Sequence, residues 1–416
     1  MFFENVPGLS LGLYKIKREK GGEMKKLILL LVFFCLSSIN VACNNVEENG
    51  GETAGGGIVN PPPVLPPPVI DVPLEERLRV HIINAQQGDT TLIVGPNGKI
   101  LLIDGGNNGA GKRDIVPYLR GLGIKSGIDY IVNTHPHEDH LGGLDEVIEG
   151  GYDVRKHIWD NGNSKTGSAI SDFLNAATTT TAGAVTPIPL GQIIDLGNGA
   201  RATVVAVGGR ILGTTTPFVV SNENDQSVAL LISYGRFNLL MTGDLGGGEW
   251  AADRNCTGRT TSQKNLESLL ARSLLPGGGA SLLPDSGVDL MMVAHHGSES
   301  STNRDWMNSL MPRVAVISVG KGQSRGWDHP RKDVVENVLL ARGPCITAPS
   351  ALVLQTDEGS PVGSETSTAG FVVGDVTVTT DGKTGYYVSG SGRVREGSPD
   401  ERSQAGIVPS LFLPFQ

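Results

Sequence analysis

The hydrophobic pattern changes character at about Arg77, where short runs rich in β-branched residues begin to alternate with turn-forming residues. The stretch TTLIVGPNGKILLIDGG (90–106) contains two apolar runs around GPNG, which predicts a β-hairpin. IDYIV (128–132) predicts a short buried strand, and LDEVIEG (144–150) is typical of a helical turn. The pattern predicts an α/β domain over residues 77–395, followed by a C-terminal tail over 396–416.

The N-terminal part follows a different pattern. MKKLILLLVFFCLSSINVAC (24–43) begins with two lysines, continues as an apolar run and ends with small residues, as a signal peptide does. The run is too short for a comfortable membrane span, which needs about 20 apolar residues. We therefore expect a signal peptide over 24–42, with residues 1–23 as a misassigned upstream extension.

NVAC resembles a bacterial lipobox, in which the cysteine is lipidated, although Asn40 stands where a Leu-like residue is usual. The expectation is lipidation of Cys43, with a plain secretory signal as the alternative. The protein is then extracytoplasmic, either anchored to a membrane through the lipid or secreted. Residues 43–76, rich in Gly and Pro and almost without apolar periodicity, predict a disordered tether.

Composition adds little to this picture. The net charge of −9 argues against a broad phosphate-binding surface of the kind that general nucleic-acid binders use. The four cysteines show no C-x-x-C spacing, so neither a cysteine zinc site nor a disulfide framework is indicated. Pairing of Cys256 with Cys345 stays open.

The densest chemistry lies in NTHPHEDHLGG (133–143), between the predicted buried strand and the predicted helix. Neutral imidazoles and carboxylates need partners once they leave water, so this stretch is either a solvated loop or a metal site. His135 and His137 are two apart and can converge on one ion. Asp139 and His140 can face a neighbouring ion, as a pair of metals about 3.5–4 Å apart requires.

Further potential ligands appear where later apolar runs end. GRFNLLMTGDLGG (235–247) places Asp244 after a predicted strand, where a carboxylate can bridge two cations. VDLMMVAHHGSESS (288–301) places His295 and His296 after another. Each of these residues by itself is an ordinary turn or surface residue. Together with the first loop they predict a two-metal site.

These motifs, H-x-H-x-D-H-x-G-G, T-G-D and A-H-H-G-S in this order, resemble those of the metallo-β-lactamase superfamily. More narrowly, NAQQGDTTLIV, ILLIDGG, NDQSVALLISYGRFNLLMTGDL and MMVAHHGS resemble the hydrolase domain of ComEC-type DNA-uptake competence proteins over about residues 77–345. The resemblance implies a four-layer αββα sandwich with a two-metal site at one edge. The sequence shows no long multi-span membrane region, so only the hydrolase part is shared.

The resemblance also implies roles for the site residues. His135, His137 and Asp244 would hold the first ion, and Asp139, His140, Asp244 and His296 the second. Neighbouring residues at a strand end point to opposite sides, so we expect His295 to contact substrate or protonate the leaving group. SVGKGQSRGWDHP (318–330) resembles a segment that would place His329 across the cleft from the metals, and the alternative is that His329 only precedes a helix at Pro330. The catalytic candidates are Asp139, His295 and His329.

The sequence departs from the superfamily in one motif. Many members carry a third histidine where this chain reads SNENDQS (221–227), so Asn224 or Asp225 is the expected substitute and the first ion the weaker one. Two extra segments, 164–184 and 246–263, are expected to be loops beside the cleft. Asp89 either supports the metal loop or only forms a turn.

The expected cofactors are two divalent cations, zinc with manganese as the alternative. They would lower the pKa of bound water to about 7 and offset charge on a phosphoryl or carbonyl oxygen. The first hypothesis is a hydrolase of phosphodiesters, either nucleic acid or a phosphorylated envelope component. The alternatives are a lactam, lactone or ester hydrolase and a non-catalytic surface binding protein. No protein partner is inferred.

Overall fold

The computed structural model describes residues 73–248, 262–321, 327–360, 365–392 and 410–415. These all belong to one compact unit, Leu65–Gln416. The predicted signal peptide, Cys43 and all but the last four residues of the predicted tether lie outside the described residues. Within the part of the chain that is described, no helix combines the length and apolarity needed to cross a membrane.

The first sheet carries the predicted metal loop. Its strands run in the order β18-β17-β16-β1-β2-β3-β4-β5-β6. Their bounds are β1 Leu78–Ile82, β2 Thr91–Val94, β3 Ile100–Ile103, β4 Gly127–Val132, β5 Asp153–Asp160, β6 Val185–Pro187, β16 Val376–Thr380, β17 Gly385–Gly390 and β18 Leu411–Pro414. The predicted GPNG hairpin joins antiparallel β2 and β3, and its Gly98 has a φ of +83°, which glycine adopts without strain.

The second sheet carries the later motifs. Its strands run in the order β15-β14-β13-β12-β11-β10-β8-β7, with β9 paired to β8. Their bounds are β7 Ile193–Gly197, β8 Ala200–Val207, β9 Arg210–Ile211, β10 Ala229–Tyr234, β11 Phe237–Met241, β12 Leu290–Met292, β13 Val314–Ile317, β14 Leu352–Gln355 and β15 Phe371–Val372. From β11 to β15 neighbouring strands are parallel, so their carboxyl ends share one edge.

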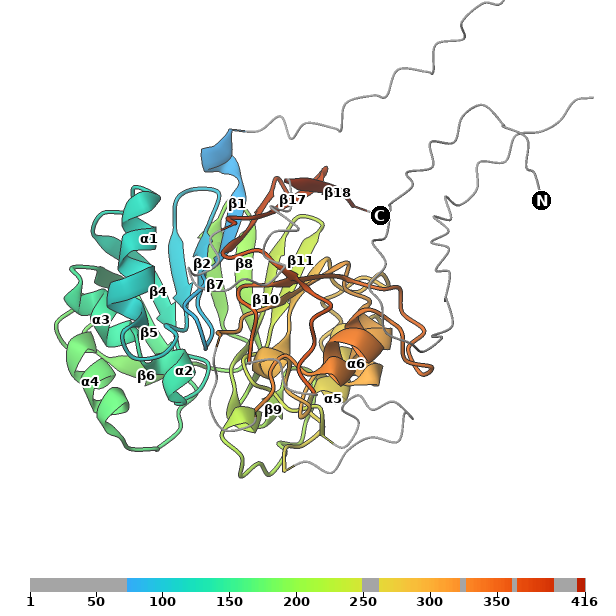
Figure 1. The fold of residues 1–416 in the computed structure, drawn as a ribbon. Helices are drawn as coiled ribbons and strands as arrows, with labels where there is room; N and C mark the ends of the chain where they lie inside the picture. Colours follow the sequence, from blue (N-terminus) through green and yellow to red (C-terminus); the bar gives the residue numbers. More distant parts are fainter. Residues whose placement is uncertain (1–72, 249–261, 322–326, 361–364, 393–409, 416) are drawn as a thin grey trace, which may run out of the picture. The chain divides into compact units, whose positions relative to one another are not determined.

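The helices cover the outer faces of the two sheets (Figure 1). On the first sheet lie η2 Gly111–Ile115, α1 Val116–Gly121, α3 Leu144–Glu149 and α4 Ser168–Ala177, and on the second lie α5 Glu267–Leu274, α6 Arg304–Leu310 and η6 Asp333–Leu339. Three apolar clusters result, one between the sheets and one beneath each helical layer. This is the predicted αββα sandwich.

Strand β4 shows how the layers form from sequence. All six of its residues are buried; Tyr130 and Val132 face the other sheet, while Ile128 and Ile131 face the helices. A strand covered on both faces reads as a continuous apolar run because both sets of side chains leave water. Each fully buried aliphatic side chain contributes about 1.5–3 kcal/mol, which holds the loop after β4 on a rigid base.

Three expectations about the chain outside the core need correction, and the state of one cysteine can be added. Residues 74–76, placed in the tether, form a short 3-10 turn. The segment 164–184 is not only a loop, because it contains helix α4, whose Phe173 packs under the helical layer. The predicted tail contains β18, which pairs with β17 because edge strands readily add another strand. Cys345 is disulfide-bonded, and the other cysteines lie outside the described residues.

Candidate metal centre

The candidate ligands lie just beyond the ends of three strands from the two sheets. The loop after β4 carries His135 and His137 and leads into α2 (Glu138–Leu141). Asp244 follows β11, and the histidine pair follows β12. The parallel β11–β12 pairing and the hydrogen bond from Val228 N to Thr134 O bring the two sheets' loops together. Residues more than 100 positions apart therefore meet at one edge of the sandwich.

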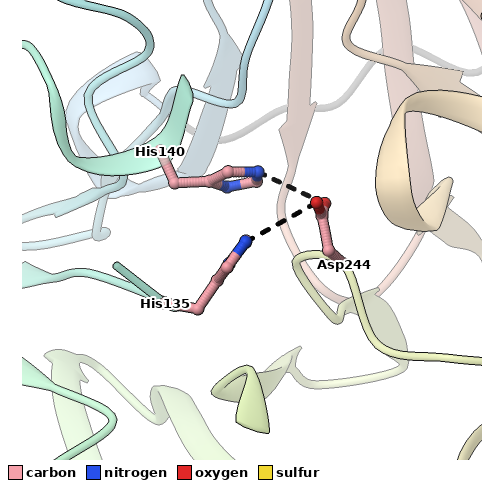
Figure 2. A group of neighbouring side chains, drawn as sticks. All are labelled: His135, His140 and Asp244. Atoms are coloured by element: carbon pink, nitrogen blue, oxygen red, sulfur yellow. Dashed lines mark ion pairs between the residues drawn. The ribbon is translucent and has the colours of Figure 1, made fainter. Parts of the chain in front are cut away.

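Asp244 lies at the centre of this cluster. Figure 2 shows the imidazoles of His135 and His140 both directed at its carboxylate. His140 Nε2 lies 3.2 Å from Asp244 Oδ1, and His135 Nε2 lies 3.6 Å from Asp244 Oδ2. The side chain of Asp244 is 2% exposed, so both oxygens are held in a site nearly without water. Asp244 thus lies between histidines on both of its oxygens, where the sequence analysis expects it.

The Oδ1 side of Asp244 gathers the second set of candidate ligands. His296 Nε2 lies 3.8 Å from Asp244 Oδ1 and 3.2 Å from Asp139 Oδ2. His140 completes this side, and the ligand atoms of Asp139, His140 and His296 all lie within 4.8 Å of one another. These are the residues that the sequence assigns to one ion.

The Oδ2 side gathers the other set. His135 Nε2 lies 3.1 Å from His137 Nδ1. His295 Nε2 lies 3.6 Å from Asp244 Oδ2, the same separation as His135 Nε2 has from that oxygen. His295 stands at the rim of this cluster, because it belongs to none of the groups whose ligand atoms all lie within 4.8 Å of one another.

The adjacent pair His295 and His296 differs from expectation in its orientation. Both residues have left-handed backbones, with φ 50° and ψ 44° at the first and φ 53° and ψ 26° at the second. Alternation between opposite sides applies to extended strands, and two consecutive left-handed residues do not follow it. Both imidazoles therefore face Asp244, one at each oxygen.

Several residues that the sequence analysis did not single out hold these ligands in place. Asp104 accepts hydrogen bonds from the Thr134 backbone N–H at 2.7 Å and from the Thr134 hydroxyl at 2.7 Å, and its Oδ2 lies 2.9 Å from His140 Nδ1. A carboxylate on the far nitrogen of a ligating histidine sets the tautomer and orientation of the ring. Asp104 directly follows strand β3 in ILLIDGG. The criterion that singled out Asp244, a carboxylate just after a buried strand, therefore applies to Asp104 as well.

The partners on the Oδ2 side are more exposed. Glu223 Oε2 lies 2.8 Å from His137 Nε2, so the Nδ1 of that ring is directed toward His135. Lys165 contacts the same glutamate oxygen. Ser300 Oγ lies 2.8 Å from His295 Nδ1, which leaves Nε2 of that ring toward Asp244. Glu223 stands beside the two substitutes considered from sequence and was overlooked.

Of the two expected substitutes for the missing histidine, only Asn224 faces the centre. Its Nδ2 lies 3.4 Å from His295 Nε2. The carboxylate of Asp225 instead accepts hydrogen bonds from the backbone N–H of Lys264 and from the side chain of Gln263. Asp225 thus tethers the segment that follows the T-G-D loop. Its position next to Asn224 in a short 3-10 turn points the two side chains apart.

Asp89 supports the metal loop and does more than form a turn. Its backbone N–H donates to Asp139 O at 3.0 Å. Its carboxylate Oδ1 lies 3.4 Å from His296 Nδ1, which is also 2.9 Å from Ser318 O. A Cβ on Gly88 would lie 2.0 Å from Asp139 O, so only glycine allows this approach.

The electrostatics of the cluster favour a positive charge beside Asp244. Burial favours the neutral form of His140, but Asp244 and Asp104 outweigh it and hold the pKa of His140 well above its usual value. The pKa of His296 is raised in the same way, against burial, by Asp244 and Asp139. Burial would raise the pKa of Asp244, yet the surrounding histidines hold it well below its usual value. A cation between these carboxylates is therefore stabilised.

The donor set fits divalent metal ions. His140 Nε2, His296 Nε2 and Asp244 Oδ1 are buried, and within the described residues none makes a hydrogen bond of acceptable geometry. Two ligands at zinc bond lengths of about 2.0–2.2 Å lie roughly 3.4 Å apart in a tetrahedral arrangement. The separations in the cluster run from 3.1 Å to 3.8 Å. Imidazoles and carboxylates suit zinc, with manganese as the alternative.

The cluster opens into a cleft of about 750 Å³. Its lining includes the side chains of the cluster, Lys165 and the first residues of helix α4: Asp139, Asn224, Asp244, His295, His296, Lys165, Ser168, Ala169 and Ile170. His329, Trp327 and Arg331 line it as well, and the ring of His329 lies 5.6 Å from that of His295. His329 therefore lies in the cleft, beside His295. Within the segment 246–263, residues 249–261 lie outside the described residues.

The family profile described as Metallo-beta-lactamase superfamily matches residues 83–290, which include the metal loop and Asp244 and end at the first residue of strand β12. The chain belongs to this superfamily. The match covers half of the chain, and the two-sheet sandwich with an edge site is the superfamily fold that the sequence predicts. The chain is thus a hydrolase-like member of a superfamily whose fold holds divalent metals, and its own His and Asp clusters can hold them.

Two curated proteins are similar in sequence. ComE operon protein 3 of Bacillus subtilis (strain 168) is 23% identical over 299 residues, which is 68% of this chain and 32% of that protein. Recombination protein 2 of Haemophilus influenzae is 25% identical over 264 residues, or 62% of this chain and 26% of that protein. The aligned region thus spans about a third or less of the length of these relatives. The predicted resemblance to competence proteins is confirmed at low identity.

Solved structures with similarity to this chain include the metallo-beta-lactamase fold protein YhfI from Bacillus subtilis. It is 11% identical, covers 58% of this chain and 86% of its own, and has a TM-score of 0.35. A diphosphatase from the PhnP family is 14% identical, covers 66% of this chain and 96% of its own, and has a TM-score of 0.34.

Proposed function

We propose that this protein is a two-metal hydrolase that cleaves phosphodiester bonds outside the cytoplasm. The observation that carries the proposal is the division of histidines between the two oxygens of Asp244. His135 and His295 approach Oδ2, while His140 and His296 approach Oδ1. A carboxylate with imidazoles at both oxygens is the arrangement that a two-metal hydrolase requires of its bridging ligand.

The residues that would hold the ions follow from this division. His135, His137 and Asp244 would hold the first ion, and Asp139, His140, Asp244 and His296 the second. When bound, the two cations supply a nucleophilic water of lowered pKa, about 7, and offset negative charge on the substrate. The chain contributes a rigid, nearly dry floor, because Asp104, Asp89 and the Ser318 carbonyl hold the ligand rings from behind.

The cleft supports a phosphodiester substrate of limited length. Arg331 lines it but pairs with Glu299 at 2.9 Å, and Lys165 pairs with Glu223. Lys165 and Arg331 are the only lysine or arginine side chains among the described residues that line the cleft, so with both paired and a net charge of −9 this part of the chain offers little basic surface to a long polyanion. Trp327 lines the cleft with 56% of its surface exposed and offers an aromatic face to a base or sugar. His329 lies within reach of the same substrate.

The reaction is tested with the full chain after loading with zinc or manganese. We expect hydrolysis of bis(p-nitrophenyl) phosphate that stops on chelation and returns when metal is added. A nitrocefin-type lactam, a lactone and a p-nitrophenyl ester provide the comparison substrates. Turnover of one of these without phosphodiester turnover would favour the alternative hydrolase, and bound metal with no turnover would favour a binding protein.

The proposed location has its own test. We propose that the chain is exported through residues 24–42 and lipidated at Cys43, because the apolar run and NVAC together form a lipoprotein signal. Metabolic labelling with a fatty acid is expected to tag the wild type and a Cys35→Ser control but not Cys43→Ser. An untagged wild-type protein with a free N-terminus would replace the lipid anchor by simple secretion and leave the hydrolase proposal unchanged.

A further inference from the structure

We propose that His295 is the third nitrogen ligand of the first metal ion. It would replace the histidine that many superfamily members carry where this chain reads SNENDQS (221–227). This inference rests on the proposed two-metal function and changes the role expected for His295 from substrate contact to metal ligand. Asn224 then lies beside this ligand and does not replace it. The ion on the Oδ2 side of Asp244 is held by His135, His137 and His295.

The first argument is the symmetry of the contacts around Asp244 Oδ2. His295 Nε2 and His135 Nε2 both lie 3.6 Å from this oxygen. That separation is too long for a hydrogen bond and close to the roughly 3.4 Å between two ligands of one tetrahedral zinc ion. His295 therefore has the same separation from Asp244 Oδ2 as His135, which is already assigned as a ligand of the first ion.

The second argument is that His295 is oriented from behind in the manner of a ligand. Its Nδ1 lies 2.8 Å from Ser300 Oγ, and its backbone N–H donates to Gly243 O at 3.2 Å, within the loop that carries Asp244. A metal-ligating histidine almost always has its other ring nitrogen bound to a partner in this way. The left-handed backbone at His295 directs the remaining nitrogen at the carboxylate rather than along the strand.

The third argument concerns Asn224, the other candidate for this position. Its Nδ2 is 3.4 Å from His295 Nε2, while its Oδ1 is buried and has no hydrogen-bond partner among the described residues. An amide is a weaker zinc ligand than a neutral imidazole. Where both side chains reach the same point, the imidazole is the preferred donor, and the buried amide oxygen is left to contact the substrate.

The test measures bound zinc rather than activity. Wild type is expected to retain two equivalents after dialysis against a weak chelator, measured by plasma mass spectrometry. His295→Ala is expected to retain one, with the first-site affinity lowered by more than the roughly 10- to 100-fold that loss of an outer partner causes. His329→Ala, which removes a neighbouring imidazole from the same cleft, is the matched control and retains two.

A double variant shows which ion is lost. His296→Ala is expected to keep the ion on the Oδ2 side, and His295→Ala combined with His296→Ala is expected to keep neither. His295→Cys replaces the imidazole by a thiolate, which also binds zinc, and is expected to recover the lost zinc equivalent. His295→Asn is not expected to recover it. Thermal unfolding of each metal-free variant identifies any that fails to fold. If His295→Ala does not fold, the zinc content of His295→Cys decides whether position 295 holds a ligand.

The outcomes separate this inference from the proposed function. Two zinc equivalents of unchanged affinity in His295→Ala, with phosphodiester turnover lost, would overturn the ligand role and return His295 to substrate contact. The two-metal hydrolase would still stand. A wild type that binds no zinc or manganese would overturn the proposed function itself.

Discussion

The two sides of Asp244 use similar ligands but hold them differently. On the Oδ1 side the rings of His140 and His296 are 0% and 1% exposed. On the Oδ2 side His135 is also 0% exposed, but His137 and His295 are 33% and 23% exposed. The partners differ in the same direction, because Asp104 is 1% exposed and Glu223 is 29% exposed.

This difference shows how one cluster can hold two ions with unequal strength. A buried, fully bonded support fixes a ligand ring before the metal arrives, so little rotational freedom is lost on binding. A half-exposed ring supported by an exposed carboxylate retains that freedom and competes with water. We therefore expect the Oδ2 side to bind its ion more weakly, in agreement with the sequence-based expectation for the His135/His137 site.

The largest effect is expected at the residue that the two sides share. Asp244→Asn removes the anionic bridge, so both ions should be lost on dialysis. Activity should fall by more than the roughly 100- to 1,000-fold that removal of one transition-state donor causes. Metal analysis and phosphodiester turnover measure this, with Asp225→Asn as the control that keeps both ions. A variant that keeps one tight ion would show that Asp244 does not bridge.

The order in which the ions leave sharpens the comparison directly. When the wild type is dialysed against progressively stronger chelators, the ion on the Oδ2 side should leave first, with a Kd at least about 10-fold weaker than that of the second ion, within the 10- to 100-fold range of ligand support. His140→Ala should abolish the tight equivalent. If instead the Oδ1 side empties first, burial of the supporting groups does not determine the affinity in this protein.

The supports themselves should differ in importance. Asp104→Asn should weaken the tight ion by about 10- to 100-fold, because the carboxylate that orients His140 is lost. Glu223→Ala should weaken the other ion by a smaller factor, since an exposed pair contributes little. Competition with a coloured zinc chelator measures both. Glu138→Gln is the control for Glu223, as Glu138 bonds Asn108 on the surface. Equal losses would remove the distinction between the sides.

The smallest effect on the metals is expected from Glu267, which bonds the chain that follows the His295/His296 loop. Its two carboxylate oxygens accept hydrogen bonds from the backbone N–H groups of Thr302 and Asn303. These residues closely follow Ser300, which contacts His295. Burial raises the pKa of Glu267 to about 8, although these N–H groups lower it. The folded state therefore holds the proton more tightly than the unfolded state does.

The sign of the pH dependence follows from this raised pKa. Stability from the protonated Glu267 is fully present below the unfolded pKa of about 4.5 and is lost as pH rises toward 8. In the metal-free protein the free energy of unfolding should fall less between pH 5 and 8 in Glu267→Gln than in the wild type, because glutamine does not titrate. The substitution should also lower overall stability by about 1–3 kcal/mol, because the amide N–H₂ faces a backbone donor. Denaturant titrations across this range measure both, and an unchanged slope would contradict the assignment.

Local pattern was sufficient for much of the fold and for the densest part of the site. The GPNG hairpin, the buried strand β4 and the helix α3 are each encoded within a few residues. His135, His137, Asp139 and His140 lie on one turn, and no distant contact is needed to bring them together. Helix α4 and strand β18 were missed because their stability comes from packing and pairing with distant elements.

The sequence by itself determined which side chains gather at the candidate metal centre, because residues at strand ends converge wherever strands of adjoining sheets stop at one edge. Only the tertiary structure decided how those side chains are oriented. The partners of His140 and His137 lie 36 and 86 positions away, at Asp104 and Glu223, and no local pattern links them. The direction of His295 depends on two left-handed residues held by contacts to Gly243 and Ser300. Backbone alternation, a local rule, fails there because long-range hydrogen bonds stabilise a conformation that neither histidine prefers by itself.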